Sequence, residues 1–433
     1  MAAASTAGAQ RPPAQSAARL LLVAAPDSYR TAAYLAAAQR CGIAVLIASE
    51  GRHSLVSAIA GGLHIDLADP AAFEVLLAAD RAHPFCGVVA TDDATVELAS
   101  RVAERLGLPH NPPEAARRTR RKDLSRTALA AYGAGVPEFR ILDLARPLAV
   151  QLAPVCYPCV IKPLTLSGSR GVIRADNQAQ ALAACRRIRA LLAREPLPDR
   201  FAATHLLLES FVPGPEVALE GMLSDGQLQV LALFDKPDPL DGPYFEETYY
   251  ITPSRHAASV QQAVSASVQV ACQALGLRAG PVHAEVRIAA QGCVIMEVAA
   301  RTIGGDCARL LRAATGHGLE ELVIAHASGR QLAFEPAPGA AGVLMLPIAQ
   351  AGILRRIEGI GAARAVPFIE DISIAIREGY ELVPLPEGAS YLGFMFARAP
   401  TPAQAEAALR AAHAQLDIVV APLLRMHDLR AGD

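Results

Sequence analysis

The first hundred residues of the chain alternate short apolar runs with alanine-rich helical stretches. An apolar run at 20–25 is followed by a helical pattern at 29–40. A second run lies at 44–48, and a third at 87–90 precedes a helical pattern at 95–106. Such alternation predicts parallel strands with helices on the faces of the sheet. The beginning of the chain is therefore expected to form an α/β domain.

Two loops follow strands of this sheet. The first strand leads into Pro26-Asp27-Ser28, which lacks the glycine-rich pattern of dinucleotide-binding proteins. The strand at 87–90 ends in Thr91-Asp92-Asp93, at the edge where open α/β sheets bind ligands. The same three residues are equally well explained as the start of the next helix, so both interpretations stay open.

The length of the chain predicts several domains. Its 433 residues are 52% apolar, which is enough for more than one hydrophobic core. A proline-rich joint at 108–113 marks the end of the first domain. The expected division is a disordered tail at 1–17, an N-terminal α/β domain at 18–115, a central domain at 116–335 and a C-terminal α+β domain at 336–433. The last domain contains short strands and one amphipathic helix at 402–415.

Charge and hydropathy argue against two classes of partner. The net charge of −2 provides no basic field for nucleic acid or an anionic membrane surface. No apolar run approaches the ~20 residues that a membrane-spanning helix needs, and the N-terminal segment lacks a signal-peptide cleavage pattern. The 8 cysteines are scattered, as expected of reduced thiols in the cytoplasm. Cys156 and Cys159 open an apolar strand without a second ligand pair, so we expect neither zinc nor redox chemistry there.

A lysine and a glycine loop open the region that carries chemistry. Val160 to Pro163 is an apolar strand containing Lys162, and the loop Ser167-Gly168-Ser169-Arg170-Gly171 follows within a few residues. Backbone N–H groups of such a loop can surround phosphate oxygens while the lysine supplies positive charge. Taken alone, a surface hairpin explains this pattern equally well.

A second apolar strand leaves its sheet between two carboxylates. Glu209 ends the apolar run, and the chain then passes through Pro213-Gly214-Pro215 to Glu216. The extended backbone between them can pair with the edge of an adenine base. A carboxylate at either end can accept hydrogen bonds from ribose hydroxyls.

Two acidic residues are predicted to meet on a hairpin. Glu285 and Glu297 lie on apolar strands that flank a turn at Gln291-Gly292. Two such carboxylates repel each other unless a cation joins them, and oxygen ligands together with phosphate favour Mg²⁺. Arg301 and the flexible backbone of 302–305 follow directly. The arginine fork suits an acyl phosphate or a substrate carboxylate.

In this order and spacing, the motifs resemble an ATP-grasp domain. The resemblance runs from Lys122 to Gly305, and the three-part layout of nearly everything after residue 18 is similar to that superfamily. The run Glu-Val-Ala-Ala-Arg-Thr-Ile-Gly-Gly at 297–305 most resembles the L-amino-acid ligases that make dipeptides. The resemblance implies an ATP-grasp fold of mixed α/β and α+β class, with a parallel N-terminal domain and a small C-terminal domain.

The resemblance also implies roles for the motif residues. Glu285 and Glu297 are expected to bind magnesium, and Arg301 and Gly304 to stabilise the acyl phosphate and its transition state. The expected ATP ligands are Lys122, Lys162, Ser167, Gly168, Ser169, Gly171, Glu209, Ser210, Phe211, Val212 and Glu216.

Three further positions bear on metal and substrate. Many members carry a metal-binding Asn two residues after the second Glu, and Ala299 stands there in this chain. This replacement leaves the presence of a second metal ion open. By analogy with amino-acid ligases, Glu247 is expected to pair with a substrate ammonium beside Tyr250, although an exposed acidic loop has the same composition. His283 is expected to be structural.

Together these features predict an ATP- and Mg²⁺-dependent ligase that activates a carboxylate as an acyl phosphate and joins it to an amine. The substrates are expected to be small and amino-acid-like, and Mn²⁺ to substitute for Mg²⁺. A biotin-carboxylase-like enzyme and a regulatory protein that binds ATP without turnover remain alternatives. A purine-biosynthesis type of ligase would need a further phosphate pocket, which the sequence does not reveal. The expected location is cytoplasmic, and related enzymes suggest a homodimer by analogy.

Overall fold

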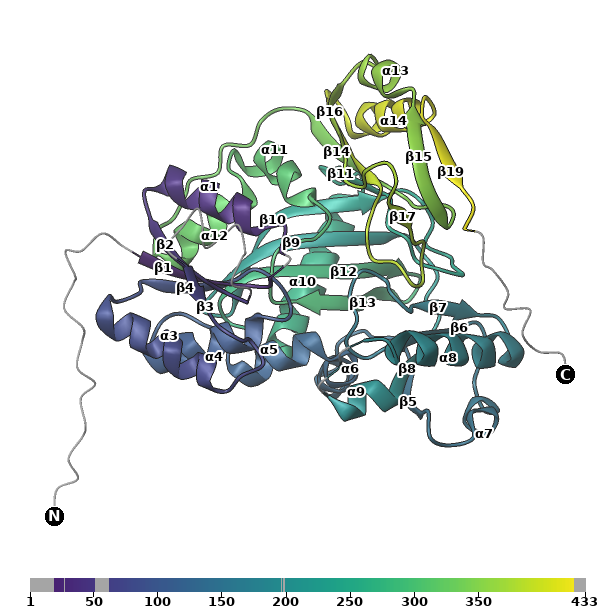
Figure 1. Ribbon diagram of the computed structural model, residues 1–433, viewed down its shortest axis with the longest axis horizontal. Helices are drawn as coiled ribbons and strands as arrows, with labels where there is room; N and C mark the ends of the chain where they lie inside the picture. The colour runs from purple at the N-terminus through teal and green to yellow at the C-terminus, as the bar shows by residue number, and fades with distance from the viewer. Residues whose placement is uncertain (1–18, 27, 51–61, 196, 198, 424–433) are drawn as a thin grey trace, which may run out of the picture.

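The computed structural model describes residues 19–26, 28–50, 62–195, 197 and 199–423. The tail predicted at 1–17 lies outside these residues. Within the described residues the strands form four sheets. Figure 1 shows a small sheet near the N-terminus, a long central sheet, a second small sheet beside it and a short sheet near the C-terminus. None of the helices in this part of the chain has the length and hydropathy that crossing a bilayer requires.

The N-terminal strands form the predicted parallel sheet. Its order is β3-β2-β1-β4, and its strands are β1 (Arg19–Ala24), β2 (Ala44–Ser49), β3 (Gly62–His64) and β4 (Gly87–Ala90). Successive side chains of a strand point to opposite faces. One set from β1 packs toward α1 (Thr31–Cys41), and the other packs toward α3 (Ala71–Ala82) and α4 (Val96–Leu106). The prediction of helices on the faces of this sheet is confirmed (Figure 1).

Two helices follow the proline-rich joint and meet at Arg121. Helix α5 (Pro113–Arg120) ends at this extended residue, and α6 (Lys122–Ala131) begins at the next. The Arg121 guanidinium donates to the Asp123 carboxylate at 2.8 Å, which stabilises the break. The first residue of α6 thereby lines the cleft described below.

A small antiparallel sheet follows α6 in the chain. Its order is β5-β8-β6-β7, and its strands are β5 (Phe139–Asp143), β6 (Cys159–Pro163), β7 (Ile173–Ala175) and β8 (His205–Ser210). Helix α8 (Gln178–Leu192) packs on it, and the segment also contains the short helices α7 (Leu148–Leu152) and α9 (Arg200–Thr204). Cys159 is buried in β6 whereas Cys156 is exposed, so these two thiols lie in different environments.

The central sheet has the order β13-β12-β9-β10-β11-β14-β18-β16. Its first five strands are β9 (Glu216–Ser224), β10 (Gln227–Lys236), β11 (Tyr249–Thr252), β12 (Gly280–Ala289) and β13 (Gly292–Ala299). Helix α10 (Ala258–Leu275) packs on one face, and the 3₁₀ helix η1 (Cys307–Leu310) with α11 (Leu311–Thr315) and α12 (Leu319–Ala327) packs on the other. Strands β12 and β13 form the predicted hairpin, in which Glu285 is paired opposite Glu297.

The C-terminal strands extend this central sheet. Strand β14 (Ala340–Leu346) pairs with β11, and β18 (Gly393–Ala399) and β16 (Ile369–Ile374) continue from it. A separate short sheet contains β15 (Gly352–Glu358), β17 (Glu381–Leu382) and β19 (Asp417–Ala421). Helices α13 (Ile360–Arg364) and α14 (Pro402–His413) pack against the C-terminal strands of the central sheet. The boundary expected between residues 335 and 336 therefore does not separate two sheets, because the β11–β14 pairing crosses it.

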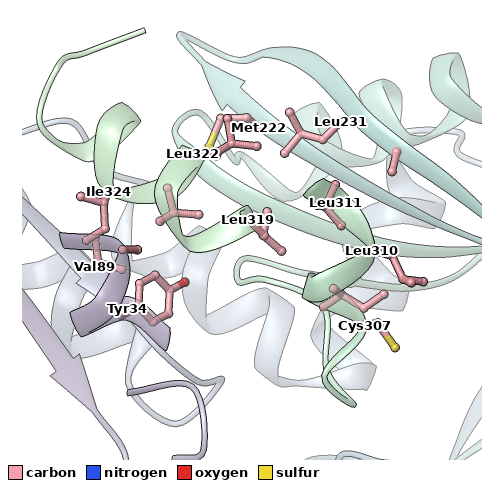
Figure 2. Close-up of a cluster of buried hydrophobic side chains, with 14 of the residues drawn as sticks. Tyr34, Val89, Met222, Leu231, Cys307, Leu310, Leu311, Leu319, Leu322 and Ile324 are labelled. Atoms are coloured by element: carbon pink, nitrogen blue, oxygen red, sulfur yellow. The ribbon is translucent and has the colours of Figure 1, made fainter. Parts of the chain in front are cut away.

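One hydrophobic cluster joins the N-terminal domain to the central sheet. Figure 2 shows Tyr34 of α1 and Val89 of β4 beside the side chains of η1, α11 and α12, which also approach Met222 and Leu231 of the sheet. Burial of apolar surface stabilises such contacts by ~25 cal/mol per Å². This shared core holds the loop between β13 and η1 against both parts of the molecule.

A loop of the C-terminal part lies against the glycine loop, Ser167 to Gly171. The Gly171 N–H donates to the Pro386 carbonyl at 2.9 Å. The Arg187 guanidinium donates twice to the Glu387 carboxylate, at 2.6 and 2.7 Å. Two-pronged arginine–carboxylate pairs are among the stronger ion pairs at a surface. We call residues 384–391 the C-terminal latch.

Replacing Leu275 with Ala tests the core beneath α10. This side chain is fully buried among residues of the central sheet, and its truncation should lower the free energy of unfolding by ~2–5 kcal/mol. Urea titration followed by circular dichroism measures the change. Val270→Ala on the same helix is the matched control, because Val270 is 37% exposed, and it should cost less than ~0.5 kcal/mol. Equal losses in the two variants would contradict this packing.

Candidate active site

A cleft lies between the small antiparallel sheet and the central sheet. The predicted site residues that line it are Lys122, Lys162, Ser167, Gly168, Ser169, Glu209, Ser210, Phe211, Val212, Glu216, Glu247, Glu285 and Glu297. The structure thus gathers residues from α6, β6, β8, β9, β12 and β13. Gly171, Tyr250, Arg301 and Gly304 lie outside the lining. Gly171 contacts the C-terminal latch through its N–H, and Gly304 lies in the loop that follows Arg301.

Apolar side chains form much of the remaining wall. They are Val160, Leu166, Val172, Leu240, Phe245 and Met296, and such a lining suits a planar base. The N–H groups of Ser210 and Phe211 donate to the carbonyls of Glu138 and Pro158 at 2.8 and 3.1 Å. These two N–H groups already have protein partners. The predicted contact with adenine would therefore use other backbone groups of this segment.

Lys162 is held in the cleft by a buried carboxylate. Its ammonium lies 2.6 Å from Glu209, which is 0% exposed and also pairs with Arg126. Burial alone raises the pKa of Glu209, but the charges of Arg126 and Lys162 outweigh it and lower that pKa to about 2. Whatever contact Glu209 makes with a ligand, its ion pairs position Lys162.

A buried lysine that the sequence did not single out lies among three carboxylates. Lys236, the last residue of β10, has a side chain that is 4% exposed, and its ammonium lies 2.8 Å from Glu216 and 3.4 Å from Glu285. It also pairs with Glu247. The three carboxylates have oxygens within 4.8 Å of one another. The only sequence signal for Lys236 was its place at the end of an apolar strand, which it shares with Lys162.

Burial and the neighbouring charges shift the pKa values of two carboxylates in this cluster in opposite directions. Burial and the neighbouring Glu285 raise the pKa of Glu247. The pKa of Glu285 lies well below its usual range, because Lys236 and His283 outweigh the effect of burial. Arg287 completes the set by donating to Glu216 at 2.9 Å. An arriving cationic group, such as an ammonium or a metal ion, would find carboxylates that are already oriented.

The two predicted metal ligands point toward the same cleft from adjacent strands. The Glu297 carboxylate lies 3.4 Å from the Lys122 ammonium, while Glu285 belongs to the Lys236 cluster. Their oxygens form a hard donor set that fits Mg²⁺, and both side chains keep an open side toward the cleft. Ala299 is buried farther along β13 and offers no ligand atom.

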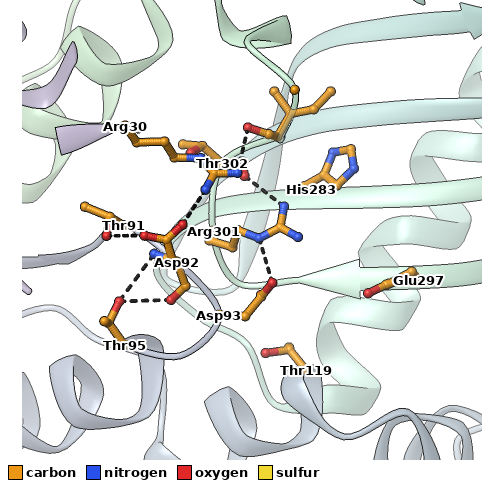
Figure 3. A network of polar contacts seen from close by, with 12 residues as sticks. Arg30, Thr91, Asp92, Asp93, Thr95, Thr119, His283, Glu297, Arg301 and Thr302 are labelled. Carbon is orange, nitrogen blue, oxygen red and sulfur yellow. Dashed lines mark hydrogen bonds and ion pairs between the residues drawn. The ribbon is translucent and has the colours of Figure 1, made fainter. Parts of the chain in front are cut away.

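Arg301 is anchored by the N-terminal domain. Its Nε donates to the Asp93 carboxylate at 3.0 Å and its Nη1 to the Thr302 carbonyl at 2.9 Å, as Figure 3 shows. Burial alone raises the pKa of Asp93, yet the Arg301 charge holds it below its ordinary value. Glu297 lies close enough to contribute to the raised pKa of Arg301. Of Thr91-Asp92-Asp93, the Asp93 side chain therefore pairs with a predicted site residue, and the N-cap of α4 is Thr95.

The backbone after Arg301 is also held by residues of the N-terminal domain. Arg30 donates to the Asp92 carboxylate at 2.5 Å and to the Ile303 carbonyl at 3.4 Å. The Gly305 N–H donates to the Tyr29 hydroxyl at 2.9 Å. Gly305 has φ +63°, and a Cβ there would lie 2.5 Å from the Met345 sulfur, so the turn requires glycine. Sequence reasoning missed Tyr29 and Arg30, since the loop that contains them has no recognisable motif.

The predicted substrate residue Tyr250 lies beside the cluster rather than in the lining. It is buried on β11, its ring packs edge-to-face on Phe234, and the Lys236 ammonium lies 5.1 Å from the ring centroid. Glu247 and Tyr250 are therefore neighbours, as expected, but they share Lys236 as a partner.

Three family models match successive parts of the chain. They describe an ATP-grasp N-terminal domain at 35–110, an ATP-grasp domain at 155–309 and an L-amino acid ligase C-terminal domain 2 at 344–421. The N-terminal and central matches lie on the parts that form the cleft and its Arg301 anchor.

Curated relatives are similar at modest identity. An uncharacterized protein, y4rH, of Sinorhizobium fredii is 27% identical over 79% of this chain and 70% of its own length. Dapdiamide A synthase of Enterobacter agglomerans is 28% identical over 56% of this chain and 57% of its own length. Carnosine synthase 1 of Gallus gallus is 27% identical over 64% of this chain and 32% of its own length. The latter two matches span less than two thirds of those relatives.

Solved structures agree on the fold. The L-amino acid ligase from Bacillus licheniformis superposes with a TM-score of 0.81 at 24% identity, over 94% of this chain and 100% of that one. The N5-carboxyaminoimidazole ribonucleotide synthetase from Thermotoga maritima gives a TM-score of 0.68 at 14% identity, over 93% and 100%. A biotin carboxylase from Campylobacter jejuni gives 0.63 at 14% identity, over 92% of each chain. The predicted fold class, including the parallel N-terminal sheet, is confirmed.

Replacing Glu209 with Gln tests the buried ion pairs behind Lys162. The variant leaves Arg126 and Lys162 without their shared anion, so at neutral pH it should lose ~3–5 kcal/mol of unfolding free energy. Because the folded pKa of Glu209 is lowered to about 2, the contribution is present above the ordinary value of 4.5 and is lost as pH falls toward 2.

Urea titrations of both proteins at several pH values measure this effect. The difference between wild type and Glu209→Gln should shrink as the pH falls from 5 toward 3. A difference that stays constant across this range would exclude the proposed pairing.

Proposed function

The chain is a member of the ATP-grasp ligase superfamily, and we propose that it forms an amide or peptide bond between amino-acid-like substrates. One observation carries the proposal. Arg301, anchored by Asp93, lies beside Glu297 at the edge of a cleft that also holds Lys122 and Lys162. A guanidinium fixed next to a nucleotide site is suited to a phosphorylated carboxylate.

In this mechanism a substrate carboxylate oxygen attacks the γ-phosphorus of ATP, which releases ADP and forms an acyl phosphate. An amine then attacks the acyl carbon, phosphate leaves, and the amine loses a proton. Glu285 and Glu297 would hold Mg²⁺, which supplies positive charge against the phosphates when it is bound.

The protein's own residues orient and neutralise the reacting groups. Lys122 and Lys162 would bind phosphate oxygens, and Arg301 with the Gly304 N–H would stabilise the acyl phosphate. The glycine loop, covered by the C-terminal latch, would exclude water that otherwise hydrolyses this intermediate. The apolar wall and the backbone near Val212 would hold the adenine.

Two observations favour amino-acid-like substrates. The C-terminal segment at 344–421 matches the L-amino acid ligase C-terminal domain 2 model. Glu247 lines the cleft and pairs with Lys236, and side chains of opposite charge suit a zwitterion. We assign the substrate ammonium to Glu247, with Tyr250 as its buried neighbour.

The proposal also includes the choice of metal ion, the cellular location and the oligomeric state. Mn²⁺ is expected to replace Mg²⁺, because both accept carboxylate oxygens. The enzyme is expected to act in the cytoplasm and to form a homodimer, as analogy with related enzymes suggests. Sedimentation velocity of the purified protein tests the dimer directly.

A screen of substrate pairs tests the function. The purified protein is incubated with ATP, Mg²⁺ and pairs of amino acids or small carboxylates, and released phosphate is measured with mass spectrometry of the products. The expected result is phosphate release with particular pairs only, with a product lighter than their sum by one water. Bicarbonate-dependent hydrolysis stimulated by biotin would instead support a carboxylase, and ATP binding without turnover would support a regulatory role.

Replacing Glu297 with Gln tests the metal assignment. Loss of a charged ligand should lower kcat at least ~100-fold, while circular dichroism and thermal melting remain close to wild type. Glu74→Gln on α3 is the matched control, since Glu74 is exposed and far from the cleft in the fold. A Glu297→Gln enzyme with wild-type kcat would remove Glu297 from the metal site.

A further inference from the structure

A fully buried carboxylate lies between the loop that follows Arg301 and the predicted metal ligand Glu285. Glu220 stands in the middle of β9 and is 0% exposed. It shares its face of the sheet with Glu216, but unlike that residue it does not line the nucleotide cleft. Burying a carboxylate is costly unless its oxygens are paired. An apolar side chain at this position would stabilise the sheet at least as well, so the contacts of Glu220 are informative.

Each oxygen of Glu220 contacts a different element of the site. Oε1 accepts from the backbone N–H of Ile303 at 3.2 Å, within the loop between Arg301 and Gly304. Oε2 lies 3.2 Å from Nδ1 of His283 on β12. The other ring nitrogen of His283 lies 3.6 Å from the Glu285 carboxylate. One side chain therefore connects the arginine loop with a residue of the predicted metal site.

We propose that Glu220 is a positioning residue, which sets the arginine loop and the carboxylate of Glu285 in a fixed relation. The proposal rests on the ligase function and deepens it. The loop at 301–305 has no helix or strand of its own, so its position depends on side contacts. Arg30 and Tyr29 hold it from the N-terminal domain, and Glu220 holds it from the central sheet.

The contact through His283 has a separate effect. Residues that hydrogen-bond to a metal ligand orient it, and their loss typically costs ~10–100-fold in metal affinity or activity. His283 is buried between Glu220 and Glu285. Without the Glu220 anion, the imidazole loses the partner that orients its ring toward Glu285.

Two substitutions separate these two contacts. Glu220→Gln keeps an oxygen that can accept from the Ile303 N–H but removes the anion beside His283. Glu220→Leu removes both contacts. Asp235→Asn is the matched control, because Asp235 is a buried carboxylate of β10 in the same sheet that accepts from Ser254 and Arg255 and makes no contact with the arginine loop.

Three measurements are made on each variant. Mn²⁺ binding to the protein–ADP complex is measured by electron paramagnetic resonance, amide hydrogen exchange of the peptide covering 301–306 by mass spectrometry, and kcat with KM for ATP by phosphate release. Glu220→Gln should bind Mn²⁺ ~10-fold more weakly and lower kcat ~10–100-fold with KM for ATP within ~3-fold, while exchange at 301–306 stays near wild type. Glu220→Leu should show both the weaker Mn²⁺ binding and faster exchange.

Other outcomes would overturn the proposal. If Glu220→Gln and Glu220→Leu match Asp235→Asn in Mn²⁺ binding and amide exchange, Glu220 is only part of the packing. If Glu220→Leu does not fold, Glu220→Gln alone decides through its Mn²⁺ affinity. A wild-type protein that releases no phosphate with any substrate pair would refute the ligase function, yet metal binding and exchange would still decide the role of Glu220, because neither measurement needs turnover.

Discussion

Two buried acidic side chains beside the cleft have lowered pKa values because cations lie within contact distance of them. Lys236 has this effect on Glu285, and Arg126 with Lys162 has it on Glu209. In a low-dielectric site an unpaired carboxylate would take up a proton and lose its value as a ligand. These ion pairs therefore keep carboxylates of the cleft charged before a magnesium nucleotide binds. They also hold the paired lysine and arginine side chains in fixed positions.

The loop at 301–305 is held by contacts from two domains. The loop at 301–305 contacts Tyr29 and Arg30 of the N-terminal domain through its backbone, and it contacts Asp93 through the Arg301 side chain. The Ile303 side chain enters the hydrophobic cluster that joins the N-terminal domain to the central sheet. The N-terminal α/β domain thus contributes contacts to the proposed active site. The hydrogen bonds to Asp93 and to the Thr302 carbonyl orient the Arg301 guanidinium.

Sequence patterns predicted those features that depend on local spacing. The parallel N-terminal sheet follows from alternating apolar runs, and the opposition of Glu285 and Glu297 follows from two strands joined by a tight turn. Lys236 and Glu220 were not found, and the pairing of Asp93 with Arg301 was not predicted, because the partners lie far away in the chain. The pairing of β14 with β11 was missed for the same reason, since strand periodicity does not name the partner strand.

The C-terminal latch joins the glycine loop and α8 to the opposite end of the chain. Glu387 pairs with Arg187 of α8, and the Pro386 carbonyl accepts from the Gly171 N–H. If the glycine loop and α8 move together away from the latch when ADP leaves, an exposed ion pair has to break in every cycle. Dissolved salt weakens such a pair, so the residence time of the nucleotide would shorten as ionic strength rises. The turnover rate of the enzyme would then depend on the ionic strength of the solution as well as on the substrates.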